Sequence, residues 1–153
     1  MHTIYVDADA CPVKNEVYRV ASRYGMHVAV VANATQRVPA NPLVKLVVCP
    51  GFGAADDWIA EQAESGDIVV TADIPLASRC LAKGIHVLDA KGRSFTDGNI
   101  GSALAMRDLT DGLRQGGTFT GGPAPMTPKD RSRFLSKLDE AVNTVRRAHP
   151  DLR

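Results

Sequence analysis

The sequence predicts an α/β protein built on a mostly parallel, doubly wound sheet. Segments with strand-like and helix-like patterns alternate from the start of the chain. The strand-like segments are almost continuously apolar, which is typical of strands covered on both faces. Helices that connect parallel strands provide that cover. The 153 residues suffice for a domain with its own core, and we expect a single domain over residues 1–153.

The first strand and helix are the clearest of these units. Residues 3–6 are β-branched or aromatic throughout and form a run too short for a helix. Pro12 suits the first turn of a following helix, where a backbone N–H would have no partner. Gly25 is a natural C-cap for that helix. One helical face between them is apolar and consists of Val13, Val17, Val20, Ala21 and Tyr24.

The alternation continues to residue 88. A helix with an apolar face follows Gly53, and we expect it to end at Gly66. A shorter helix begins at Pro75 and is expected to end at Gly84. The remaining strands are expected at residues 27–32, 43–49, 67–73 and 85–88, and the last of these should complete the sheet.

The last third of the chain has a different composition. A turn-rich link leads into a helix expected at residues 99–114, which would complete a core of about residues 1–115. A Gly/Pro-rich arm of about residues 116–127 should be mobile or extended. Thr127 as N-cap and Asp130 at the third helical position predict a C-terminal helical extension over about residues 128–148. Its core-facing stripe would consist of Phe134, Leu138, Ala141, Val142 and Val145.

The composition limits the classes of function. The net charge is only +1, so contact with a polyanion would require a local basic patch. No segment approaches the roughly 18 apolar residues of a membrane helix, and the N-terminus shows no targeting pattern, so we expect no membrane contact. Cys11, Cys49 and Cys80 fit neither a disulfide framework nor a zinc site. We therefore expect a cytoplasmic protein, and its oligomeric state stays open.

Acidic residues follow several of the expected strands. Asp7 and Asp9 end the first strand and occupy alternate positions, which face the same way on an extended chain. Asp73 ends the strand at residues 67–73, and Asp56 and Asp57 open the helix after the third strand. Ligands of a parallel sheet bind beyond the carboxyl ends of its strands, where the strand order reverses. We therefore expect four or five carboxylates at one edge of the sheet.

Such a cluster favours a bound cation, because close carboxylates raise one another's pKa. Mg²⁺ or Mn²⁺ prefers oxygen ligands and keeps positions open for water. An ion held in this way would support hydrolysis of a phosphate ester, and its ligands would be Asp7, Asp9, Asp56, Asp57 and Asp73. Structural explanations stay open as well: Asp56 and Asp57 can complement a helix dipole, and Asp73 can be a turn residue before a helix.

Other residues are weaker candidates. Thr71 could orient water or a ligand beside Asp73, although threonine is also an ordinary strand residue. Cys11 could be a nucleophile if a helix start lowered the pKa of its thiol. Three cations could bind phosphate groups, although each also suits a solvated helix: Lys14, Arg79 and Arg107. The final helix is basic, as an RNA-facing or a merely solvated surface would be, through Lys129, Arg131, Arg133 and Lys137.

Four motifs give the chain a family resemblance. They are DADACPVK at residues 7–14, GAADDWIA at 53–60, GDIVVTADIPLA at 66–77 and GGPAPMTPKDRSRF at 121–134. Together they resemble the motifs of the bacterial YaiI/YqxD family, which looks like a branch of the PIN-like domains. Many PIN-like domains are metal-dependent ribonucleases.

The resemblance implies a three-layer α/β/α sandwich in which the first and fourth strands are adjacent. It implies that Asp7 matches the acid at the end of the first PIN strand and that Asp73 matches the acid after the fourth. Asp56 or Asp57 stands where PIN-like domains usually carry a helical glutamate. The sequence departs from the pattern at that point, with shorter acids in an earlier helical turn.

Three functions remain open from the sequence. The leading one is a Mg²⁺- or Mn²⁺-dependent ribonuclease with Asp7 and Asp73 as main ligands, supported by Thr71. The second is a phosphatase of the haloacid-dehalogenase type, in which Asp7 is the nucleophile and Asp9 the general acid. The third is a non-catalytic module that binds RNA or a protein through the Gly/Pro-rich arm and the basic final helix.

Overall fold

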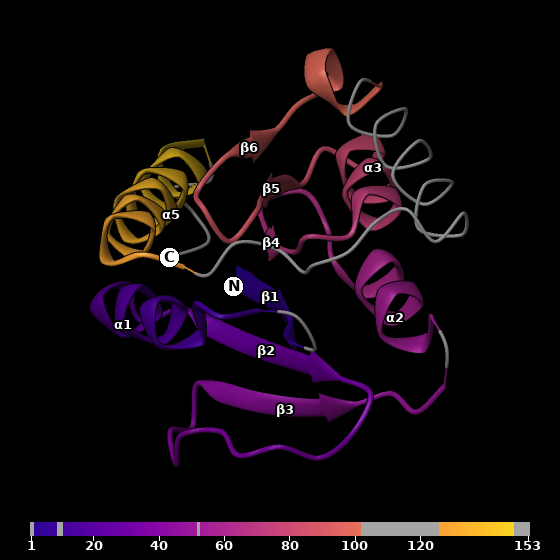
Figure 1. Ribbon diagram of the computed structural model, residues 1–153, viewed down its shortest axis with the longest axis vertical. Helices are drawn as coiled ribbons and strands as arrows, with labels where there is room; N and C mark the ends of the chain where they lie inside the picture. Colours follow the sequence, from indigo (N-terminus) through magenta and orange to yellow (C-terminus); the bar gives the residue numbers. More distant parts are fainter. Residues whose placement is uncertain (1, 9–10, 52, 102–125, 149–153) are drawn as a thin grey trace.

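A six-stranded sheet forms the middle of the molecule (Figure 1). The computed structural model describes residues 2–8, 11–51, 53–101 and 126–148. The strand order is β3-β2-β1-β4-β5-β6; the first five strands in the chain are parallel, and β6 is antiparallel to β5. The strands are β1 (Thr3–Asp7), β2 (His27–Ala32), β3 (Val44–Val48), β4 (Ile68–Val70), β5 (His86–Leu88) and β6 (Ser94–Phe95).

The strand order reverses between β1 and β4. From β1 the chain moves outward to β2 and β3, and it then returns to place β4 on the other side of β1. In register, Ile4 is paired with Val28 on one side and with Ile68 on the other. The adjacency of the first and fourth strands is therefore confirmed. The carboxyl ends of β1 and β4 lie at the position where open parallel sheets bind their ligands.

Helices cover both faces of the sheet, which confirms the three-layer arrangement (Figure 1). On one face, α1 (Lys14–Tyr24) packs against α5 (Pro128–Ala148). On the other, α2 (Ala54–Gln62) packs against α3 (Ile74–Ala82). The central strands β2 and β4 are consequently buried along nearly their whole length.

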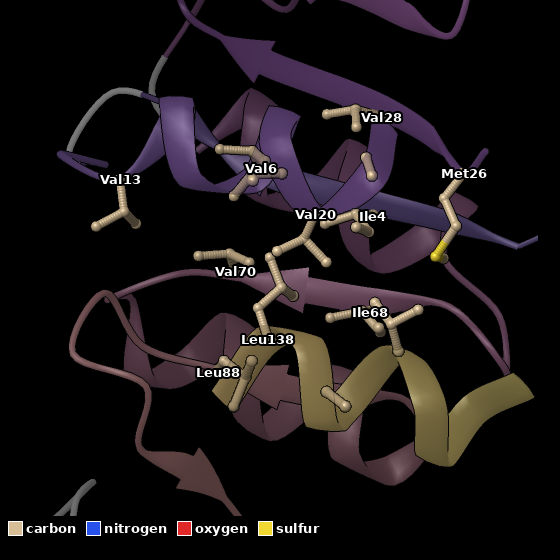
Figure 2. Packing of buried hydrophobic residues seen from close by; sticks show 14 of the residues in the cluster. Ile4, Val6, Val13, Val20, Met26, Val28, Ile68, Val70, Leu88 and Leu138 are labelled. Carbon is tan, nitrogen blue, oxygen red and sulfur yellow. The ribbon is translucent and has the colours of Figure 1, made fainter. Parts of the chain in front are cut away.

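A hydrophobic cluster fills the space between the sheet, α1 and α5 (Figure 2). Ile4 and Val6 of β1 and Ile68 of β4 meet Val20 of α1 and Leu138 of α5. The second cluster lies on the opposite face, under α2 and α3. The expected stripe of the final helix is buried in the first cluster, from Phe134 to Val145.

The predicted starts and ends of helices are confirmed at three places. Gly25 is the C-cap of α1 and adopts the left-handed conformation, with φ of 65°. Thr127 and Asp130 form a reciprocal capping box at the start of α5: each side chain accepts a hydrogen bond from the backbone N–H of the other at 3.1 Å. The proline-initiated helix α3 begins one residue before Pro75.

The end of α2 differs from the prediction. The helix stops at Gln62, because Ala63 is extended, with φ of −70° and ψ of 140°. Gly66 has a different role: its φ is 101°, and a side chain there would overlap the ring of His2. This glycine is needed for a close approach between the residues before β1 and β4.

The sheet does not end at β5, contrary to the prediction. A turn after Leu88 reverses the chain, and β6 pairs antiparallel with β5 through Val87 and Phe95. Residues 97–101 are helical, which agrees with the start of the helix expected at 99–114. The rest of that helix and the arm up to residue 125 lie outside the described residues. None of the helices in the described ranges is long and apolar enough to cross a membrane.

Candidate functional site

A hydrogen bond joins the ends of the two strands at the reversal of strand order. Asp7 is the last residue of β1, and Thr71 directly follows β4. The Thr71 hydroxyl donates to Oδ2 of Asp7 at 2.8 Å. Thr71 is only 3% exposed, and its own N–H donates to the carbonyl of Leu88 at 3.0 Å. The ends of β1, β4 and β5 are thus tied together through one threonine.

Asp73 continues this network. Its backbone N–H donates to the Thr71 hydroxyl oxygen at 2.9 Å. Because that oxygen accepts from Asp73, the hydroxyl proton is directed at Asp7. The Asp73 side chain is the N-cap of α3 and accepts from the N–H of Leu76 at 2.9 Å. Asp73 is therefore the N-cap of α3, which agrees with its position before Pro75. It also lies beside Thr71 and Asp7 at the ends of β4 and β1.

Asp56 brings a third segment to the same place. It lies in the first turn of α2 and is partly buried. Its pKa is raised to about 6, first by desolvation and then by the negative charges of Asp73 and Asp7. Smaller contributions come from the Asp73 side chain as a hydrogen-bond partner and from the charge of Asp57. The structure therefore brings together carboxyls from β1, the start of α2 and the start of α3.

Asp57 and Arg79 form a separate pair near this cluster. Oδ1 of Asp57 accepts from Nη1 of Arg79 at 2.7 Å, and both side chains are about half exposed or more, at 63% and 47%. The pair links α2 to α3. Asp57 thus differs from Asp56, whose pKa is raised by desolvation and by the charge of Asp73, although the two acids are neighbours in the sequence.

Lys14 connects the two loops next to Asp7. Its ammonium donates to the carbonyl of Ala8 at 3.3 Å and to Oε1 of Gln36 at 2.9 Å. Gln36 comes from the connection between β2 and β3, which sequence patterns did not mark as part of the site. Its only sequence signal was the polar character of that loop. Two further candidates, Asp9 and Arg107, lie outside the described residues.

The condition for a nucleophilic Cys11, a lowered pKa of its thiol, is not met. Burial raises the pKa of its thiol, and this outweighs the lowering by a backbone hydrogen bond from Val13 and by the charge of Lys14. The helix begins only at Lys14, so Cys11 is not in its first turn. A half-buried thiol with a raised pKa ionises less readily and is a poor nucleophile.

The acids of the described ranges do not form a preassembled metal site. Among these residues, no group of three or more His, Cys, Asp or Glu side chains is arranged to hold a metal ion. Desolvation and the nearby charges of Asp73 and Asp7 instead raise the pKa of Asp56.

The fold and the site define a class: an α/β protein whose parallel sheet carries acidic side chains where its strand order reverses. A family model described as "Uncharacterized BCR, YaiI/YqxD family" matches residues 5–144. The chain belongs to the YaiI/YqxD family.

Several bacterial relatives share more than half of the sequence. A UPF0178 protein of Nitrobacter winogradskyi is 56% identical over 95% of this chain and 93% of its own length. A UPF0178 protein of Rhodospirillum centenum is 56% identical over 96% and 99%. One of Paramagnetospirillum magneticum is 54% identical over 98% and 100%. No solved structure matches the chain significantly.

Proposed function

We propose that the protein is a Mg²⁺- or Mn²⁺-dependent phosphodiester hydrolase that acts on RNA. One observation carries this proposal: Asp7, Asp56 and Asp73 lie close together where the strand order reverses. Thr71 forms hydrogen bonds with both Asp7 and Asp73. This is the location at which parallel sheets bind ligands. The resemblance to PIN-like domains supports the same function.

The three carboxyls fit a hard divalent cation in their chemistry. They offer oxygen ligands from three separate segments, and the pKa of Asp56 is raised first by desolvation and then by the negative charges of Asp73 and Asp7. Asp9, two residues after Asp7, would add a further carboxylate. When bound, such a cation neutralises charge on a phosphodiester and makes water a better nucleophile.

The protein's own side chains would prepare the site for this reaction. Thr71 fixes the Asp7 carboxylate through a buried hydrogen bond. The Leu76 N–H fixes Asp73 in the same way. Lys14 keeps the chain after Asp7 close to the loop of Gln36. These bonds limit how far Asp7 and Asp73 would have to move to bind a common cation.

The proposal includes a cytoplasmic location. All three cysteines are free thiols, and the cytoplasm keeps thiols reduced. The partner would be RNA, and the protein would not associate with a membrane.

Cleavage of RNA tests the proposal. Unstructured oligonucleotides would be incubated with the protein and Mn²⁺, and the products would be separated by electrophoresis. We expect cleavage by the wild type, none in EDTA, and a loss of at least about a hundredfold with Asp73→Asn, since removing a key electrostatic group costs about that much. Asn remains a good N-cap, so α3 keeps its start. Asp57→Asn is the matched control and should retain most activity.

Two other results would redirect the assignment. Release of phosphate from small monoesters, with a phosphorylated Asp7 trapped on the protein, would select the phosphatase and reject the nuclease. Metal-independent binding of RNA without cleavage would select the non-catalytic module.

A further inference from the structure

A second feature at the same edge of the sheet is a rigid basic turn. Between β5 and β6 the chain turns through residues 89–93, directly after Leu88, whose carbonyl accepts the Thr71 N–H. The Asp89 carboxylate organises this turn. Its Oδ1 accepts from the N–H groups of Lys91 and Arg93, both at 2.9 Å, and its Oδ2 accepts from Nε of Arg93 at 2.8 Å.

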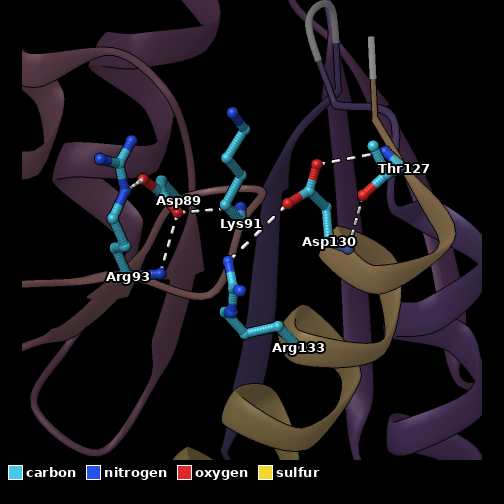
Figure 3. A network of polar contacts seen from close by, with 6 residues as sticks. All are labelled: Asp89, Lys91, Arg93, Thr127, Asp130 and Arg133. Carbon is cyan, nitrogen blue, oxygen red and sulfur yellow. Dashed lines mark hydrogen bonds and ion pairs between the residues drawn. The ribbon is translucent and has the colours of Figure 1, made fainter. Parts of the chain in front are cut away.

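The turn rests directly on α5 (Figure 3). A Cβ on Gly92 would lie 3.1 Å from Cβ of Lys137 and 3.2 Å from the carbonyl oxygen of Arg133, so the two backbones meet closely there. Gly92 has φ of 85°. Lys91 and Arg93 of the turn are therefore held beside Arg133 and Lys137 of the helix. We call these four residues the basic platform.

Three acids pair with the platform: Asp89 and Asp130 are turned inward, whereas Glu140, which pairs with Lys137 at 3.2 Å, is 63% exposed. The side chains of Asp89 and Asp130 are only 12% and 16% exposed, and both accept backbone N–H groups. The side chains of Arg93, Arg133 and Lys137 are 77%, 48% and 51% exposed. Because Asp89 and Asp130 are withdrawn from solvent and Glu140 offsets only one of the four cations, the outward surface keeps a net positive charge.

The platform lies beside the acidic site. The turn follows β5, the neighbour of β4, and Thr71 bonds to both Asp7 and the last residue of β5. Strands are about 4.8 Å apart, so the turn begins roughly one strand spacing from the chain end that carries Thr71. The start of α5 also approaches the segment after Asp7, because Arg131 donates to the Pro12 carbonyl at 2.7 Å.

We propose that the basic platform of Lys91, Arg93, Arg133 and Lys137 binds the phosphate backbone of single-stranded RNA and guides it to the acidic site. The inference rests on the proposed function and adds to it the surface that holds the substrate. The acidic site alone would repel the negatively charged RNA. The basic platform beside it offsets that repulsion. Contacts of this kind do not depend on base sequence.

Binding without metal separates this inference from hydrolysis. The anisotropy of a short fluorescent oligouridylate would be measured against protein concentration in EDTA, at several KCl concentrations. The test variant is Lys91→Gln/Arg133→Gln, which keeps the Asp89–Arg93 contacts. The control is Lys45→Gln/Arg147→Gln, which removes the same charges from β3, at the far edge of the sheet, and from the last turn of α5.

We expect the test variant to bind roughly tenfold more weakly in moderate salt. The slope of log K against log salt should become shallower by about 0.7 for each RNA phosphate that the variant no longer neutralises. The control should match the wild type. Equal binding by all three proteins, equal weakening in both variants, or no binding by the wild type would overturn the inference.

Hydrolysis then distinguishes this inference from the proposed function. Binding that depends on the platform, without any cleavage, would reject the hydrolase and keep the platform. Cleavage with an unchanged KM in the test variant would reject the platform and keep the hydrolase.

Discussion

The hydroxyl of Thr71 donates to the carboxylate of Asp7 at 2.8 Å, across the boundary between β1 and β4. The same oxygen accepts from the N–H of Asp73. One buried side chain thus fixes the relative position of the two acids that the proposed reaction needs most. Its loss should affect both the stability of the fold and the site.

Replacement of this hydroxyl is the first test. Thr71→Val keeps the shape of the side chain but leaves the Asp7 carboxylate and the Asp73 N–H without it. We expect the free energy of unfolding to fall by about 1–3 kcal/mol, the usual cost of an unmet buried polar group, as measured by urea denaturation. Thr71→Ser retains the hydroxyl and should lose less. Equal stability of the Val variant and the wild type would show that the bond contributes nothing.

The pKa of Asp56 makes stability depend on pH. Its folded pKa of about 6 lies above the ordinary value of an unfolded aspartate. Between about pH 4 and pH 6, therefore, the folded state keeps a proton that the unfolded chain has released, and stability falls as pH rises through this window. Above about pH 6 the full penalty of an ionised Asp56 is present.

Asp56→Asn should remove this penalty. Without divalent metal, we expect the variant to melt at a higher temperature than the wild type at about pH 7.5 and at a similar temperature at about pH 4, as followed by circular dichroism. Asp57→Asn is the control, because its loss of the Arg79 pair should bring no such gain. A stabilisation by Asp56→Asn that is as large at the acidic pH as at the alkaline one would contradict the assigned cause.

Gly25 and Gly66 both have positive φ, but only Gly66 also lacks space for a side chain. Gly25 has φ of 65° and nothing within 4 Å of an added Cβ, whereas an added Cβ at Gly66 would overlap the His2 ring. Gly25→Ala should cost about 1 kcal/mol for the left-handed conformation. Gly66→Ala should cost clearly more, because the ring must also move. Denaturation curves that ranked the two variants in the opposite order would reject the close approach of Gly66 to His2.

Much of this architecture was predictable from local patterns. The apolar strands predicted a sheet covered on both faces, and β2 was predicted at its observed bounds. The capping box of Thr127 and Asp130 was readable because its two residues are three positions apart. The placement of acids after strands also predicted that Asp7 and Asp73 would lie at the same edge.

Features that depend on long-range packing were not predictable. Asp56 and Asp57 look equivalent in the sequence, yet adjacent residues of a helix point about 100° apart, and only the packing of α2 on α3 decides which of them meets Asp73. The bond between Lys14 and Gln36 spans two loops. The β6 strand is two residues long and has no pattern of its own. The role of Gly66 depends on its contact with His2, a residue far from it in the sequence.

The central claim is that Asp7 and Asp73 act together as ligands of one divalent cation. Calorimetric titration of Mn²⁺ into the wild type, Asp7→Asn, Asp73→Asn and Asp57→Asn tests it most directly. We expect binding by the wild type and by Asp57→Asn, and a loss of binding in both other variants. Failure of the wild type to bind Mn²⁺ even at millimolar concentration, or unchanged binding in Asp7→Asn and Asp73→Asn, would contradict the claim.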